Sequence, residues 1–193
     1  MKKSNGSKLY FYYGTMGSAK TANALMQKYN LSEKGYRVLL LKPALDTRDG
    51  KTIIKSRVGL KSKAMIFTPS DDLIIVLKNK RFDCLIVDEC QFATSEQVEQ
   101  LRQICYNKHI NIYCYGLLAD FTTHLFEGSK RLVEIADKLI LLDNYCECGN
   151  KANVNARFDE NGNVLSEGEQ VKVGGNEMYK ALCYSCWKKK TSK

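Results

Sequence analysis

Prolines and long apolar segments are scarce in this sequence, and each scarcity argues against a class of protein. Two prolines among 193 residues and a mean hydropathy of −0.35 argue against a low-complexity chain or a membrane protein. Purely apolar runs, such as residues 73–77 and 139–142, are far shorter than the roughly 20 residues of a membrane-spanning helix. The first residues are basic and lack the apolar core and cleavage site of a signal peptide. We therefore expect a cytoplasmic protein that has no membrane partner.

The composition is that of an ordinary globular protein with an excess of positive charge. Hydrophobic residues make up 44% and charged residues 26%, and 30 Lys and Arg against 21 Asp and Glu give a net charge of +9. A chain of this length can bury one domain of typical size plus a small appendage. The lysine-rich tail at residues 188–193 adds to the charge, but terminal lysines are more often solvated than bound. We therefore expect no nucleic-acid partner.

The eight cysteines fall into two groups. Four stand singly among apolar residues, and we interpret them as small buried hydrophobes: Cys84, Cys90, Cys105 and Cys114. The other four form two close pairs near the C-terminus: Cys146, Cys148, Cys183 and Cys186. This spacing predicts a closed tetrahedral site for a structural Zn²⁺ rather than a disulfide framework. The isolated histidines, His109 and His124, are interpreted as surface or loop residues.

Strand-like and helix-like segments alternate through residue 142. Apolar runs predict strands at residues 8–13, 37–41, 64–67, 82–87, 111–115 and 138–142. Helices are expected from residue 20 to about 35, over 70–78, after a capping box at 94–97 and around 132–136, with a polar, partly mobile loop over 44–63. Continuous apolar strands indicate an α/β fold, with a parallel sheet covered by helices on both faces. The composition changes after residue 143, so we predict an α/β domain at 1–142 and a metal-binding domain at 143–193.

A glycine-containing turn lies between the first predicted strand and the first predicted helix. The phosphate-binding pattern G-x-x-x-x-G-K-[ST] is matched at Gly14, Lys20 and Thr21, but Ala19 stands where the second glycine is expected. In such a loop the backbone N–H groups and the lysine bind phosphates, and the threonine hydroxyl ligates Mg²⁺. The predicted loop comprises Gly14, Thr15, Met16, Gly17, Ser18, Ala19, Lys20 and Thr21. A plain strand–helix turn is the alternative, and the Ala19 Cβ would crowd a position that needs a positive φ.

Two carboxylates follow the apolar run at residues 82–87. Asp88 comes directly after the predicted strand, where a carboxylate can reach the Mg²⁺ of a bound nucleotide. Glu89 comes next and is placed to accept a proton from an attacking hydroxyl or water. A carboxylate pair in an ordinary turn is the alternative. Because the Asp88–Glu89 pair occurs together with the glycine-containing loop, the catalytic interpretation is favoured.

Aromatic residues recur in segments that we expect to be loops. Residues 117–121 read LLADF, Phe126 follows closely, and residues 173–179 read VGGNEMY between the cysteine pairs. Such residues can clamp a flat base by stacking and by main-chain hydrogen bonds. Taken alone, loop aromatics more often only pack against the protein.

In order and spacing, these motifs resemble the type II thymidine kinases, the cellular class that carries zinc. The motifs that carry the resemblance are GTMGSAKT at 14–21, DTR at 46–48, VDECQF at 87–92, YGLLADF at 115–121, the two cysteine pairs and EGEQVKVGGNEMY at 167–179. The resemblance implies a P-loop NTPase-like α/β fold with a small zinc-ribbon domain that carries a lasso-like loop. It covers nearly the whole chain.

The resemblance also implies a reaction, in which the γ-phosphoryl group of ATP passes to the 5′-hydroxyl of thymidine and gives dTMP. Glu89 matches the general base, and Arg48, Asp88 and Gln91 join the loop in binding Mg²⁺ and ATP. The positions that match the thymidine-enclosing residues of the family are Met16, Phe92, Leu117, Phe121, Phe126, Val173, Gly174, Gly175 and Tyr179. Family members are usually homotetramers.

Two other functions stay open at this point. A broader deoxynucleoside kinase, or an ATPase on the same scaffold, would use the same loop and acidic pair. A zinc-ribbon module that binds nucleic acid is favoured by the +9 charge, but it leaves the loop and the acidic pair unexplained.

Overall fold

A parallel sheet forms the centre of the computed structural model, which describes residues 6–170 and 178–191. Its six strands lie in the order β5-β2-β6-β7-β1-β8, and every neighbouring pair is parallel. The strands are β1 (Leu9–Tyr13), β2 (Val38–Pro43), β5 (Met65–Phe67), β6 (Cys84–Val87), β7 (Asn111–Gly116) and β8 (Lys138–Leu141). All six predicted strands are therefore present, and the predicted parallel sheet is confirmed.

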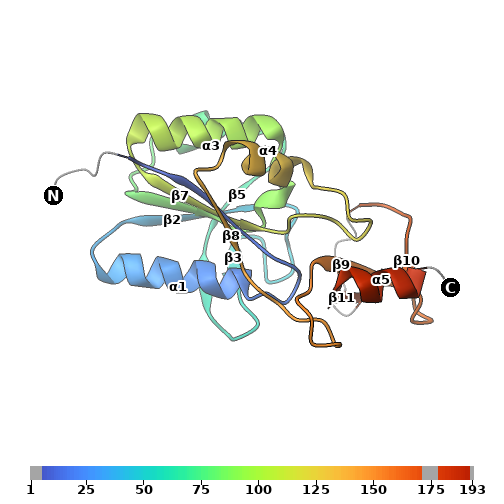
Figure 1. Cartoon of the computed structure of the whole chain (residues 1–193). Helices are drawn as coiled ribbons and strands as arrows, with labels where there is room; N and C mark the ends of the chain where they lie inside the picture. Colours follow the sequence, from blue (N-terminus) through green and yellow to red (C-terminus); the bar gives the residue numbers. More distant parts are fainter. Residues whose placement is uncertain (1–5, 171–177, 192–193) are drawn as a thin grey trace.

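Helices cover both faces of this sheet (Figure 1). Helix α1 (Lys20–Glu33) lies on one face, and α3 (Ser95–Lys108) and α4 (Glu127–Ile135) lie on the other. Within β6, Ile86 packs into the core beneath α1, whereas Val87 packs into the core beneath α3. Successive side chains of a strand point to opposite faces, so a strand buried on both faces has a continuous apolar sequence.

Helix α2 (Leu73–Leu77) is shorter than the helix predicted over 70–78. Its N-cap is Asp72, whose carboxylate accepts hydrogen bonds from the N–H groups of Ile74 at 2.8 Å and Ile75 at 3.1 Å. This cap begins the helix later than the apolar pattern suggested. The capping box of α3 is present as predicted, with Thr94 and Gln97 bonded reciprocally.

The segment over residues 44–63 contains a hairpin in its second half, so the prediction of a polar, partly mobile loop was wrong for residues 53–63. Strands β3 (Ile53–Lys55) and β4 (Lys61–Lys63) pair in antiparallel fashion. The turn closes where Ser56 N–H donates to the carbonyl of Leu60 at 2.8 Å. Of the six strand residues only Ile54 is buried, which explains why no apolar alternation marks the strands in the sequence.

A second, smaller unit follows β8 and lies beyond the carboxyl ends of the sheet strands (Figure 1). Strands β9 (Val154–Phe158), β10 (Val164–Leu165) and β11 (Tyr179–Leu182) form an antiparallel sheet in the order β10-β9-β11, and α5 (Tyr184–Thr191) follows. Its small core consists of Cys146, Ala152, Ala156, Leu182 and Cys183. Among the described residues, no helix combines the length and apolar character needed to cross a bilayer.

Candidate functional site

The predicted phosphate-binding loop connects β1 to α1. It lies at the carboxyl ends of the sheet strands, on the side of the small unit. A Cβ on Gly14 would lie 2.4 Å from the carbonyl oxygen of Leu142, so the close approach of the neighbouring chain requires glycine there. Ala19, which replaces the expected second glycine, has a φ of 58° in the left-handed region. The loop therefore keeps the backbone conformation that favours glycine, and Ala19 adopts it at a cost in strain.

Lys20 places its ammonium group inside this loop. Its Nζ donates to the carbonyl oxygens of Thr15 at 2.7 Å and Gly14 at 3.0 Å. Burial lowers the pKa of Lys20 to about 8, while the nearby charges of Glu89 and Asp88 act in the opposite direction. An enclosed cation beside backbone N–H groups is suited to binding an anion.

Asp88 is the first residue after β6 and is buried, with 4% of its surface exposed. Burial, followed by repulsion from Glu89, raises the pKa of Asp88 to about 7, whereas the Thr21 hydroxyl and the Lys20 charge lower it. Thr21 of the loop lines the same cleft as Asp88 and Glu89, so the loop and the acidic pair meet at one place. Two hard oxygen ligands, a hydroxyl and a carboxylate, lie there together, which suits Mg²⁺.

The carboxylate of Glu89 is held at both of its oxygens. Oε1 accepts from Nη2 of Arg48 at 2.5 Å, and Oε2 accepts from Nε2 of Gln91 at 2.6 Å. Gln91 is fixed in turn, because its Oε1 accepts from the N–H of Leu117 at 3.1 Å. Glu89 has a φ of 50°, in the left-handed region that non-glycine residues seldom adopt.

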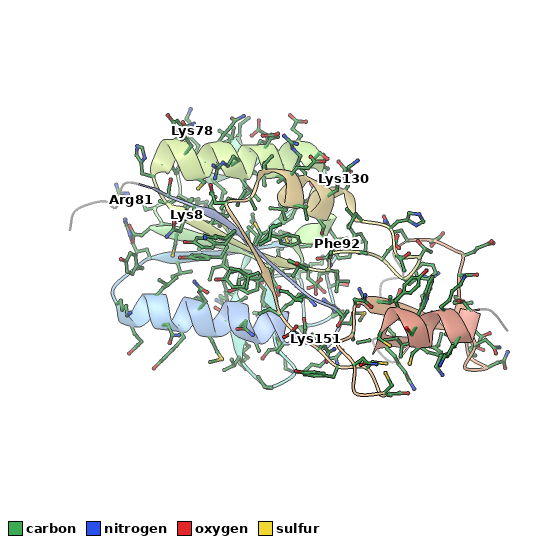
Figure 2. The ribbon with its side chains drawn as sticks, in the orientation of Figure 1. Lys8, Lys78, Arg81, Phe92, Lys130 and Lys151 are labelled. Atoms are coloured by element: carbon green, nitrogen blue, oxygen red, sulfur yellow. The ribbon has the colours of Figure 1, made fainter. Side chains whose placement is uncertain are left out.

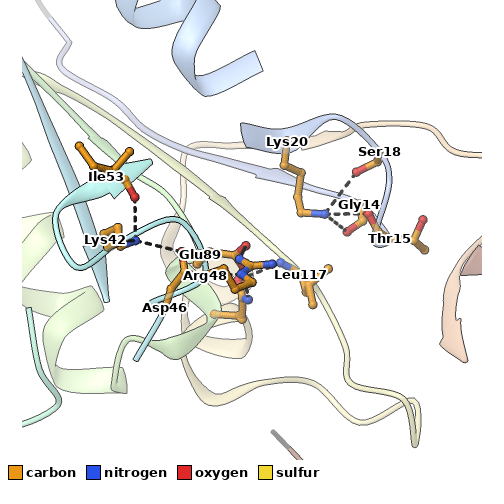
Figure 3. A network of polar contacts seen from close by, with 12 residues as sticks. Gly14, Thr15, Ser18, Lys20, Lys42, Asp46, Arg48, Ile53, Glu89 and Leu117 are labelled. Carbon is orange, nitrogen blue, oxygen red and sulfur yellow. Dashed lines mark hydrogen bonds and ion pairs between the residues drawn. The ribbon is translucent and has the colours of Figure 1, made fainter. Parts of the chain in front are cut away.

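Arg48 is also bonded to a carboxylate that the sequence analysis did not single out. Its Nε donates to Oδ1 of Asp46 at 2.7 Å (Figure 3). Partial burial lowers the pKa of Arg48. The charge of Glu89 and the hydrogen bond to Asp46 outweigh this effect, so the pKa of Arg48 lies above its usual value. Within the DTR motif at 46–48, Asp46 therefore holds Arg48, and Arg48 contacts Glu89.

A cleft of about 960 Å³ connects the loop and the acidic pair with the predicted aromatic residues. It is lined by Phe92, Leu117, Phe121, Phe126 and Tyr179 together with Met16 of the loop. The rings of Phe92 and Phe126 meet edge to face, with centroids 5.9 Å apart. Figure 2 shows Phe92 toward the end of the sheet nearest the small unit, away from Lys8 at the opposite end.

Three of the predicted thymidine-enclosing residues, Val173, Gly174 and Gly175, lie outside the described residues. The adjoining segment is held against the cleft at two places. The Nη1 atom of Arg157 donates to the carbonyl of Glu169 at 2.8 Å, and its guanidinium lies 3.6 Å from the ring centroid of Phe121. Gln170 donates to Oδ2 of Asp120 at 2.9 Å.

Two asparagines that the sequence analysis missed connect the small unit to the phosphate-binding loop. Asn155 Oδ1 accepts from the N–H of Met16 at 2.7 Å, and its Nδ2 donates to the carbonyl of Ala119 at 2.9 Å. Asn144 Nδ2 donates to the carbonyl of Met16 at 2.8 Å and to Thr15 Oγ1 at 3.2 Å. An asparagine outside a motif gives no sequence signal, because its role depends on which backbone groups the fold brings to it.

The four paired cysteines converge on one point of the small unit. Their sulfur atoms all lie within 4.8 Å of one another, and Cys148 and Cys183 are 3.6 Å apart. Sulfur ligands of a tetrahedral Zn²⁺ at about 2.3 Å would lie roughly 3.8 Å apart, so the donor set and its size fit that ion. The other four cysteines are buried, and His109 and His124 are exposed, as predicted.

The fold and the site together define a nucleotide-binding protein of the P-loop α/β class, in which a strand, a phosphate-binding loop and a helix face a buried aspartate. The chain belongs to the thymidine kinase family. The profile of that family, described as thymidine kinase, matches residues 7–187. The family and its named members therefore give this chain the function of a thymidine kinase.

Individual relatives carry the same description. The chain is 42% identical to the thymidine kinase of Shewanella oneidensis over 181 residues, which cover 92% of this chain and 94% of that one. It is 45% identical to the thymidine kinase of Legionella pneumophila strain Paris over 182 residues, which cover 92% and 87%. It is 40% identical to the thymidine kinase of Photobacterium profundum over 186 residues, which cover 94% and 97%.

Proposed function

We propose that this protein transfers the γ-phosphoryl group of ATP to the 5′-hydroxyl of thymidine and so produces dTMP. The observation that carries the proposal is the carboxylate of Glu89, which is fixed by Arg48 and Gln91 at the point where the loop meets the aromatic cleft. A base fixed at both oxygens can take the proton of a hydroxyl that approaches from the cleft. This placement supports Glu89 as the general base.

The phosphates of ATP are assigned to the loop that connects β1 to α1. The backbone N–H groups of residues 14–21 and the ammonium of Lys20 would hold the triphosphate, and Arg48 would neutralise part of its charge. Thr21 and Asp88 are the proposed ligands of Mg²⁺, which supplies charge neutralisation at the phosphates. Their position in the lining of the same cleft supports this assignment.

Thymidine is assigned to the aromatic part of the cleft. Phe92, Phe121 and Phe126 give it flat apolar walls, while Met16 and Leu117 place it next to the loop and the base. Tyr179 lines the same space. We assign main-chain readout of the pyrimidine to Val173, Gly174 and Gly175 because the resemblance places them at such a segment.

The cysteine cluster is the proposed site of a structural Zn²⁺ held by Cys146, Cys148, Cys183 and Cys186. Four thiolate ligands leave no open position for catalysis, so the metal would serve to stabilise the small unit. We propose the division into domains at 1–142 and 143–193 because the two units have separate cores. A cytoplasmic homotetramer is the proposed form of the protein, since the family usually assembles in this way.

A panel of nucleosides tests the proposed reaction. The protein, MgATP and one nucleoside are incubated together, and nucleoside monophosphate is quantified by chromatography. Thymidine and deoxyuridine are expected to react, whereas deoxyadenosine and deoxyguanosine are not. Equal turnover of the purine nucleosides would instead support the broader deoxynucleoside kinase. ATP hydrolysis without any phosphorylated nucleoside would support an ATPase, and salt-sensitive DNA binding without either activity would support a nucleic-acid module.

A further inference from the structure

A fully buried lysine lies next to the proposed catalytic site, and the roles assigned so far do not explain it. Lys42 is part of β2, and its side chain has 0% exposed surface. Lysines are almost never fully buried without partners, because removing an ammonium group from water is costly. The partners of Lys42 therefore indicate why this position carries a charge.

The ammonium of Lys42 has three oxygen partners. Its Nζ donates to the carbonyl oxygens of Ile53 at 2.8 Å and Gly50 at 3.2 Å, and it lies 3.3 Å from Oδ2 of Asp46. Two hydrogen bonds and one ion pair therefore compensate the buried charge. The two carbonyls belong to the start of the β3–β4 hairpin, whereas Asp46 lines the cleft.

Asp46 binds a different cation with each of its oxygens. Oδ2 faces Lys42, and Oδ1 accepts from Nε of Arg48 at 2.7 Å. Burial raises the pKa of Asp46, but the hydrogen bond and charge of Arg48, together with Lys42, lower it below its usual value. Asp46 therefore stays charged, and it fixes the guanidinium whose Nη2 binds Glu89 at 2.5 Å.

The four side chains form a row of alternating charge, from Lys42 through Asp46 and Arg48 to Glu89 (Figure 3). Without the Lys42 charge, Asp46 would keep only Arg48 as a cationic partner. The attraction of Arg48 to Asp46 would then compete more strongly with its bond to Glu89. The orientation of the proposed base would be defined less well as a result.

We propose that Lys42 is a positioning residue for phosphoryl transfer, because it holds Arg48 against Glu89 through Asp46. The inference rests on the proposed function of Glu89. Lys42 acts at a distance from the nucleoside and is not a catalytic residue. A simpler structural role is the anchoring of the hairpin through Gly50 and Ile53, and the test must separate the two roles.

A double-mutant cycle with Lys42→Met and Asp46→Asn makes this separation. Both substitutions keep the approximate side-chain volume and remove a charge. If Lys42 acts through Asp46, its replacement matters only while Asp46 is charged, so the effects on kcat are not additive. If Lys42 only anchors the hairpin carbonyls, its replacement has the same effect whether residue 46 is aspartate or asparagine. Circular dichroism and thermal unfolding check that each variant is folded.

With Asp46 intact, we expect Lys42→Met to lower kcat about 30-fold and to change the KM for ATP less than about 3-fold. In the Asp46→Asn background, the same replacement is expected to change kcat less than about 3-fold. An unchanged kcat in the single variant, or an equal loss in both backgrounds, would overturn the role of Lys42.

Two further comparisons keep the inference testable. If the Lys42→Met protein does not fold, Asp46→Asn is compared directly with the double variant, in which the buried ion pair is removed as a unit. Equal kcat values support the inference, and a double variant more than about 10-fold slower overturns it. A wild-type protein that forms no dTMP would overturn the proposed function itself, and the role of Lys42 with it.

Discussion

The backbone N–H of Met16 donates a hydrogen bond of 2.7 Å to Oδ1 of Asn155. Met16 belongs to the phosphate-binding loop and Asn155 to β9 of the small unit, so the bond joins the two units at the cleft. The same asparagine donates to the carbonyl of Ala119, in the segment after β7. One buried side chain therefore fixes two walls of the cleft.

Replacement of Asn155 by alanine is expected to weaken ATP binding. The change leaves the half-buried N–H of Met16 and the half-buried carbonyl of Ala119 without their partner, at a cost of about 1 kcal/mol, and part of this appears as a looser loop. We expect the Kd for MgATP, measured by calorimetry, to rise about 10-fold. Asn153→Ala is the matched control because Asn153 is exposed next to β9. An unchanged Kd in the Asn155 variant would show that the loop does not depend on this bond.

Replacement of Ala19 by glycine is expected to stabilise the protein. Ala19 has a φ of 58°, and a residue with a Cβ loses roughly 1 kcal/mol in that region relative to glycine. Urea unfolding should show a gain of about 0.5–1 kcal/mol for Ala19→Gly and a loss for Ala19→Val, since β-branched residues tolerate this region poorly. A loss of stability in the glycine variant would mean that the Cβ contributes packing that outweighs the strain.

Replacement of Asp88 by asparagine is expected to stabilise the free protein in a pH-dependent manner while abolishing its activity. In the folded protein burial raises the pKa of Asp88 to about 7, from an ordinary value of 3.8. The unfolded chain releases this proton near the lower value, so the wild type loses stability as the pH rises between the two values.

The free energy of unfolding at pH 4 and pH 8 measures this effect. The asparagine side chain cannot ionise, so the Asp88→Asn variant should be more stable than the wild type at pH 8 and nearly equal to it at pH 4. Asp143→Asn serves as a control, because Asp143 is exposed. A variant that is destabilised equally at both pH values would show that Asp88 is not strained by burial.

Metal analysis of protein purified without chelator is expected to give about one zinc per chain, bound by the cysteine cluster. Cys148→Ser should lose the metal, and its midpoint of thermal unfolding should fall by about 10 °C because the small unit loses its anchor. Cys105→Ala, which changes a buried cysteine of the main core, should retain the metal. A wild-type protein that contains no metal and has the same midpoint of thermal unfolding as Cys148→Ser would contradict the zinc assignment.

The parallel sheet and the phosphate-binding loop could be predicted because each of them depends on local sequence. Strand β6 is continuously apolar because it is buried on both faces, and the turn before Lys20 carries the residue types that a phosphate requires. The hairpin of β3 and β4 escaped prediction because its strands bury one side chain, Ile54.

The supporting residues of the site could not be predicted for a different reason. Lys42 and Asn155 have no motif, and each is defined by carbonyl and N–H groups that only the folded chain brings near. Asp46 has a partial signal, since it opens the DTR segment that also contains Arg48. Its bond to Arg48 depends on how the chain turns after β2.

The central claim is that Glu89 takes the proton of the nucleoside 5′-hydroxyl. The most direct measurement is kcat for dTMP formation at saturating ATP and thymidine, compared between the wild type and Glu89→Gln. Glu96→Gln, which alters an exposed residue of α3, is the matched control. We predict that Glu89→Gln lowers kcat by about 10²–10⁴-fold while the Kd for MgATP stays within about 3-fold of the wild type. A Glu89→Gln protein that folds and turns over at the wild-type rate would contradict the account.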